Sequence, residues 1–196
     1  MPKVGMSQIR REQLIEATLD CVDLHGVNGA TISKISKQAG VSTGIVHHYF
    51  HNKDDLLEGS MRLMLAHLGH GIIKRKLLAK NHTESILAII DGNFSEKQIE
   101  RKSTKIWLSF WAEALHSEVL VRLQTVNMRR LHSNLTYHFK HLIPHEDAKL
   151  VASGMAALID GIWLRGAFME KGIDAKQANL MCQNYLEMVL EKYSPV

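Results

Sequence analysis

The sequence predicts an all-α protein of about nine helices, with a compact N-terminal three-helix unit and a longer helical body. Apolar residues recur at helical spacing along most of the 196 residues, and the alternation typical of strands is nearly absent. Prolines occur only at positions 2, 144 and 195, so long helices are permitted almost everywhere. Hydrophobic residues make up 45% of the chain and charged residues 22%, a composition typical of folded proteins.

The first two predicted helices are separated by a short connection. The first covers about 8–25 and stops at Gly26, because glycine commonly ends helices. Thr31 is placed to cap the second helix, 32–38, through its hydroxyl. Gly40 then supplies the left-handed residue that ends this helix.

The third and fourth predicted helices also begin at capping residues. Ser42 caps a short helix that runs through about Tyr49 and turns Ile45 and Val46 inward. Asn52 caps a much longer fourth helix that extends to about residue 79. The later helical patterns cover 83–94, 103–115, 117–142, 146–170 and 175–193.

Two short helices joined by a glycine-containing turn, after a longer helix, form the pattern of a helix-turn-helix. Ala39 is small enough for the helices to cross closely, Gly40 makes the turn, and Val41 anchors the pair to the core. The outward side of the second short helix enters the DNA major groove in such motifs. Helical spacing places Thr43, His47 and His48 on that side.

The charge balance permits DNA as a partner without requiring it. Lys and Arg number 24 against 20 Asp and Glu, which gives a net charge of +4. Phosphate affinity is expected from basic residues that flank the groove-facing helix, which itself has no Lys or Arg. These are Lys3, Arg10, Arg11, Lys34, Lys37 and Lys53.

The stretch "TISKISKQAGVSTGIVHHYFHNKDDLL" resembles the DNA-binding signature of the TetR family of bacterial repressors, over roughly residues 10–57. The resemblance implies that Ser42, Thr43, Gly44, His47 and His48 lie at the groove and that Tyr49 and Lys53 hold phosphates. Thr31 belongs to the same predicted DNA-binding set. Ile45 and His47 depart from the residues common there, a small hydroxyl residue and a tyrosine. We therefore predict a DNA-binding domain over 1–53 and a ligand-sensing and dimerisation domain over 54–196.

The helical body contains no nucleophile elbow, phosphate loop or HExxH motif, so we predict that the protein is not an enzyme. One helix-turn-helix makes few contacts, so a homodimer on a palindromic operator is expected. The last two helices suit dimerisation because they are apolar on more than one face and carry small residues. The family resemblance implies the same four-helix interface.

An aromatic cluster predicts where a ligand binds. Trp107, Phe110 and Trp111 share one helix face, and simple core packing is the alternative explanation. Aromatic faces attract desolvated cations, and Asp91 and Asp160 could neutralise one. Each aspartate stands in an Ile-Asp-Gly tripeptide, and a hydrogen-bonded packing role is equally open for both.

Beyond the DNA-binding signature, the whole chain resembles one branch of the TetR family, the repressors of the choline-to-glycine-betaine genes. The segments that carry this resemblance are "AIIDGNF", "WLSFWAEALH", "VNMRRLHSNL" and "AALIDGIWLRGAF". It implies repression of that pathway and release from DNA by choline, a quaternary ammonium effector. An aromatic cage that also uses Trp163 is our inference from the chemistry of choline. Two alternatives stay open: a TetR-type repressor of another amphiphile or a polyamine, and a metal-dependent enzyme.

No metal or cofactor is predicted. His138, His141 and His145 approach a ligand spacing, but Pro144 interrupts it, and His67 and His70 are expected at the surface. The two cysteines are far apart and both lie in apolar helical patterns. No signal peptide or apolar run of about 18 residues is recognised, so a cytoplasmic protein with no membrane partner is expected.

Overall fold

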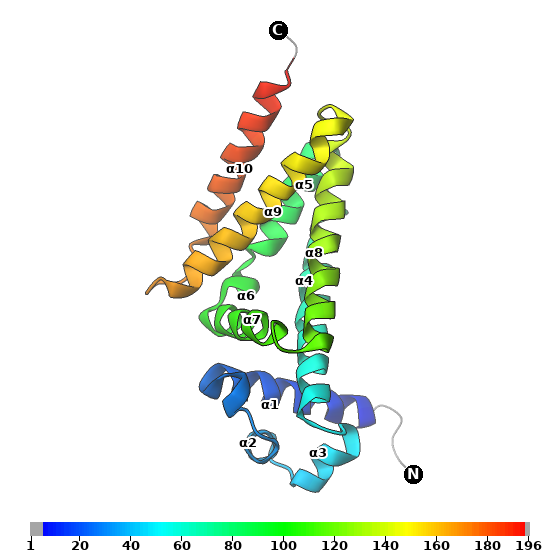
Figure 1. Cartoon of the computed structure of the whole chain (residues 1–196), viewed down its shortest axis with the longest axis vertical. Helices are drawn as coiled ribbons and strands as arrows, with labels where there is room; N and C mark the ends of the chain where they lie inside the picture. Colours follow the sequence, from blue (N-terminus) through cyan, green and yellow to red (C-terminus); the bar gives the residue numbers. More distant parts are fainter. Residues whose placement is uncertain (1–5, 195–196) are drawn as a thin grey trace. The chain divides into compact units, whose positions relative to one another are not determined.

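The computed structural model describes residues 6–194, and every regular element within them is a helix, as predicted (Figure 1). Ten helices are formed there, of which the sixth is a single turn. Their bounds are α1 (Met6–Gly29), α2 (Ile32–Gln38), α3 (Thr43–Tyr49), α4 (Lys53–Lys76), α5 (His82–Asn93), α6 (Glu96–Ile99), α7 (Arg101–Ala114), α8 (Glu118–Phe139), α9 (His145–Phe168) and α10 (Ala175–Lys192).

The end of α1 differs from the predicted stop at Gly26. That glycine has a φ of 69° and kinks the helix, which resumes and continues to Gly29. Val27 is buried directly after the kink, and the Ala30 amide donates to the Gly26 carbonyl oxygen at 3.1 Å. Burial of the extra turn therefore prolongs the helix beyond a residue that would end an isolated one.

The turn between α2 and α3 has the predicted chemistry. The Thr31 hydroxyl accepts a hydrogen bond from the Lys34 amide at 3.3 Å, and Gly40 has a φ of 65°. The Val41 amide then donates to the Ser36 carbonyl oxygen at 2.9 Å, which closes the turn. Ser42 precedes α3, but its side chain makes no capping hydrogen bond, so that part of the prediction is wrong.

One face of α3 is held by a single buried residue. Val46 is fully buried, whereas Ile45 is 39% exposed and does not face inward as predicted. Adjacent residues point about 100° apart on a helix, and this two-turn helix has one inward direction. The remaining surface of α3 is therefore available to a partner.

The chain divides into two compact units whose limits differ from the predicted boundary at residue 53. The first contains the chain up to Leu65 together with Lys105–Leu123, and the second contains Ala66–Thr104 and the chain from Gln124 onward. Leu56 and Met61, on the first half of α4, are fully buried in the first unit. The Lys105 Nζ lies 2.8 Å from the Asp23 Oδ1, which ties the start of α7 to α1. Residues 54–65 and Lys105–Leu123, which were predicted in the C-terminal domain, therefore pack with the first unit through contacts between residues far apart in the sequence.

In the second unit, α9 and α10 lie side by side (Figure 1). Gly154 on α9 lets Tyr185 of α10 approach, and the Tyr185 hydroxyl donates to the Val151 carbonyl oxygen at 3.2 Å. Gly166 makes similar room for Ile173. Part of the small-residue pattern therefore serves packing within the chain.

Among the described residues, α9 is long and apolar enough to span a membrane by length and composition. The prediction that no apolar run reaches about 18 residues is therefore wrong. A core helix satisfies the same test, and Val151, Ala152, Met155 and Ile159 are buried on one side of α9. Its other surface exposes Leu150, Leu164 and Phe168.

Candidate nucleic-acid interface and effector site

The five residues predicted at the DNA groove lie on α3 or directly before it. All five are exposed: Ser42, Thr43, Gly44, His47 and His48. The Ser42 hydroxyl has no capping role and remains open to solvent. This surface offers hydroxyl and imidazole groups, which suit hydrogen bonding to base edges more than phosphate neutralisation.

Arg11 connects α1 to the end of α3. Its Nη1 donates to the Tyr49 carbonyl oxygen at 3.0 Å, and its Cζ lies 4.2 Å from the centre of the Phe50 ring. A guanidinium at a helix C-terminus interacts favourably with the helix dipole. Arg11 therefore positions α3, a contribution that sequence spacing missed because the partners are 38 residues apart.

Two further contacts hold α2 against α1. The Gln38 Nε2 donates to the Asp20 Oδ2 at 2.9 Å, and the Lys34 Nζ donates to the Gly29 carbonyl oxygen at 3.1 Å. With the Arg11 contact, they brace the helix-turn-helix at three points. A groove-facing helix on a rigid support keeps its side chains in register with DNA.

The other predicted DNA contacts surround α3 in sequence. Lys37 is exposed at the end of α2, while Arg10, Tyr49 and Lys53 are half-buried. The Tyr49 ring packs edge-on against His48, with 4.9 Å between ring centres. Thr31 uses its hydroxyl as a helix cap, and Lys3 lies outside the described residues.

Three of the four aromatic residues of the predicted cage, Trp107, Phe110 and Trp111, belong to the first unit, whereas Trp163 belongs to the second. Trp107 and Phe110 are buried, and Trp111 is half-buried. The Trp111 Nε1 is inaccessible to solvent and has no hydrogen-bond partner among the described residues. Burial of Trp107 and Phe110 agrees with the core-packing alternative, whereas the indole nitrogen of Trp111 is a polar group that packing alone does not satisfy.

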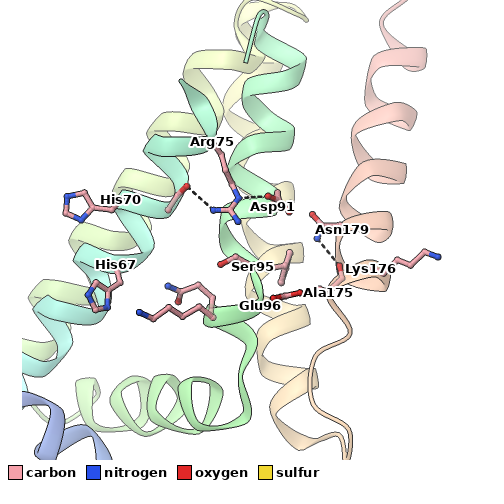
Figure 2. A pocket seen from close by; sticks show the side chains of 13 residues that line it. His67, His70, Arg75, Asp91, Ser95, Glu96, Ala175, Lys176 and Asn179 are labelled. Carbon is pink, nitrogen blue, oxygen red and sulfur yellow. Dashed lines mark hydrogen bonds and ion pairs between the residues drawn. The ribbon is translucent and has the colours of Figure 1, made fainter. Parts of the chain in front are cut away.

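Asp91 and Asp160, the two acids predicted at the effector site, have different surroundings in the second unit. Asp91 pairs with Arg75 (Figure 2), and its side chain is 54% exposed. The Asp160 carboxylate is partly buried and forms no hydrogen bond or ion pair with any described residue. Burial raises the pKa of Asp160 above its ordinary value. Trp163, one turn further along α9, is buried.

The histidines follow a different arrangement from the one their spacing suggested. The Nδ1 atoms of His82 and His138 lie 3.1 Å apart, and the His141 ring stacks on His82 with 4.0 Å between centres. No group of three potential metal ligands occurs between residues 6 and 194. His82 was not among the candidates, because its partners are about 56 residues away.

An exposed polar helix on a braced helix-turn-helix, followed by a helical body, defines a DNA-binding transcriptional regulator. Residues 14–59 match the sequence profile of the tetR family of bacterial regulatory proteins. Residues 82–191 match the C-terminal profile of BetI-type transcriptional repressors. The chain therefore belongs to the TetR family, in its BetI-type group.

Similar proteins agree with this assignment over nearly the whole length. The chain is 47% identical to the regulator BetI 1 of Chromohalobacter salexigens, covering 98% of this chain and 96% of that protein. It is 50% identical to BetI of Vibrio parahaemolyticus, over 99% and 98% of the two chains. A regulator from Saccharomonospora viridis, solved in complex with choline, shares the fold with a TM-score of 0.80, 17% identity and coverage of 90% and 95%. These relatives are regulators and not enzymes, and the chain is a transcriptional repressor of their kind.

Proposed function

We propose that this repressor acts in the cytoplasm as a homodimer on a palindromic operator of choline and glycine betaine genes. Choline is the proposed effector that releases it from DNA during osmotic stress, and no cofactor is required. The likeness to BetI regulators and to a regulator bound to choline supports this proposal. A ligand releases DNA only if it binds the DNA-incompatible conformation more tightly than the DNA-bound one.

Exposed apolar residues on α9 and α10 support the dimer. They recur along both helices, although each helix already has a buried side within the protomer. They are Leu150, Leu164, Phe168, Leu180, Met181 and Met188. Exposed apolar residues on two neighbouring helices are typical of an interface, and a second copy of the same two helices would cover them in a twofold arrangement.

The observation that carries the choline proposal is the unpaired carboxylate of Asp160. A partly buried charge without a partner is less stable than a solvated one, and a bound cation would offset that cost. A quaternary ammonium donates no hydrogen bonds, so it requires a carboxylate nearby and aromatic faces. Trp163, three residues after Asp160, lies on a neighbouring part of the same helix face.

Replacing Asp160 by Asn is expected to weaken choline binding about tenfold, because the charge is lost while the side-chain shape is kept. Tryptophan fluorescence titrated with choline measures the effect. The neutral carbon isostere of choline is the matched ligand, and it should bind the wild-type and variant proteins equally. An equal response of the wild-type protein to choline and its isostere would exclude a cation-selective site.

Replacing His47 by Ala is expected to change which operator bases are preferred, with a discrimination loss of about 1–3 kcal/mol at one position. Replacing Lys37 by Ala should instead weaken binding uniformly and lower the salt dependence. Binding to a library of randomised operators, repeated at two salt concentrations, separates these outcomes. A uniform loss in the His47→Ala variant would make His47 a backbone contact.

A further inference from the structure

Ile45 is an exposed apolar residue on the helix that faces the DNA groove. It is 39% exposed, whereas the next residue, Val46, is fully buried and anchors α3. The exposed residues beside it on α3, Thr43, Gly44 and His48, are small or polar. Packing within the protein therefore accounts for Val46, but it leaves Ile45 on the surface that DNA approaches.

Helical geometry places Ile45 at one edge of this groove-facing surface. Adjacent residues of an α-helix point about 100° apart. With Val46 directed inward, Gly44 and His48 point almost directly outward, and Ile45 and His47 lie on either side of them. The two flanking side chains differ in chemistry, because an imidazole can form hydrogen bonds with base edges and an isoleucine cannot.

Gly44 allows the side chain of Ile45 to come close to the bases. A Cβ at position 44 would lie 3.7 Å from the Ser42 Oγ, an ordinary contact distance, so packing does not require a glycine there. Its backbone is not in the left-handed region either. A glycine also permits a close approach of the helix backbone to a ligand, and this approach would bring the flanking side chains to the base edges.

The chemistry of the major groove identifies what an isoleucine can contact. The base edges present hydrogen-bond donors and acceptors there, and thymine adds an apolar C5-methyl group. A polar edge against isoleucine would lose water without gaining a hydrogen bond, whereas a methyl group would gain from the same burial. We propose that Ile45 contacts the C5-methyl group of a thymine in each operator half-site and selects thymine at that position. This inference rests on the proposed binding of a dimer to DNA, and it does not depend on choline.

Replacing single thymidines by deoxyuridine tests the inference, because the change removes the C5-methyl group and keeps the hydrogen-bonding groups of the base. The duplex is the one that the wild-type protein selects most strongly from a randomised library, and fluorescence anisotropy measures its affinity. At one thymine of each half-site, the replacement should weaken wild-type binding about fourfold, the value expected for one buried methyl group. The factor should be equal at two salt concentrations, since no phosphate contact is lost.

Two variants assign the effect to a residue. Ile45→Ala should bind the unmodified duplex about fourfold more weakly or worse, and it should lose its sensitivity to deoxyuridine at that thymine. Leu24→Ala shortens an apolar side chain of α1 that is 65% exposed, and this variant should keep the affinity and the sensitivity of the wild type. An Ile45→Ala protein that stays as sensitive as the wild type, or a wild-type protein that is insensitive at every thymine, would overturn the role of Ile45. Failure of the wild-type protein to select any duplex would instead contradict DNA binding itself, and the role of Ile45 with it.

Discussion

Lowering the pH from 7 to 5 is expected to destabilise the folded protein by about 2 kcal/mol through His138 alone. His138 is 5% exposed, and its pKa is lowered from 6.5 to about 4, mainly by burial. The nearby groups Lys76, His82 and His141 make smaller contributions to this lowering of the pKa. The folded protein therefore holds His138 neutral at a pH where the unfolded chain binds a proton.

The direction of the effect follows from that difference in proton binding. Above pH 6.5, His138 is mainly neutral in both states, and its contribution to stability is fully present. As the pH falls from 6.5 towards 4, only the unfolded state gains the proton, and stability is lost. Below about pH 4 both states are protonated and the loss reaches its limit of about 3 kcal/mol.

The contact with His82 gives this titration a structural consequence. The two Nδ1 atoms are 3.1 Å apart, so one ring must donate and the other accept. A proton on the accepting nitrogen removes the hydrogen bond and places two donors against each other. Acidification below about pH 4 should therefore loosen the connection between the start of α5 and the end of α8.

Urea unfolding followed by circular dichroism at pH 7, 6 and 5 measures the effect, with protein concentration held constant. The dependence of unfolding free energy on pH should be steeper in the wild-type protein than in His138→Gln, by up to about 1.4 kcal/mol per pH unit. His145→Gln removes an exposed histidine of the same unit and should keep the wild-type slope. Identical slopes for the wild-type and His138→Gln proteins would show that His138 binds its proton equally in both states.

The helix-turn-helix could be predicted closely because its determinants are local. The Thr31 cap depends on an amide three residues along, and the turn depends on the backbone conformation of Gly40 itself. The structure has both features at the predicted residues. The Arg11 contact with Tyr49 was missed because it depends on how two helices fold together. Local capping and turn chemistry therefore predicted the shape of the motif, and tertiary contacts determined what braces it.

The two aspartates show why the sequence alone could not distinguish a paired acid from an unpaired one among the predicted effector residues. Asp91 and Asp160 stand in identical Ile-Asp-Gly tripeptides, at the ends of similar apolar runs. Arg75, on the neighbouring helix, pairs with Asp91, whereas no described residue pairs with Asp160. The difference depends on the partner helix, which a local pattern does not contain. The same reasoning applies to His138, whose partner His82 begins another helix.

Replacing Gly92 by Ala is expected to destabilise the second unit by about 2 kcal/mol, although alanine is the better helix former. A Cβ at position 92 would lie 2.5 Å from the Ile72 Cγ1 and 3.0 Å from the Ile72 Cα. The side chain of Ile72 could rotate, but its Cα belongs to α4 and cannot move without displacing that helix. The strain of separating α4 from α5 therefore exceeds the gain in helix propensity, which is about 1 kcal/mol.

Gly69→Ala is the matched control, because Gly69 also lies inside a helix and a Cβ there would meet nothing within 4 Å. Its free energy of unfolding should stay equal to the wild-type value or rise by up to about 1 kcal/mol. Gly161→Ala, at the glycine of the second Ile-Asp-Gly tripeptide, is a second control, since its new methyl group would likewise meet nothing within 4 Å. Urea unfolding of the three variants at pH 7 measures the comparison. A Gly92→Ala protein as stable as Gly69→Ala would mean that α4 and α5 separate without cost, and that close packing at Gly92 does not hold them together.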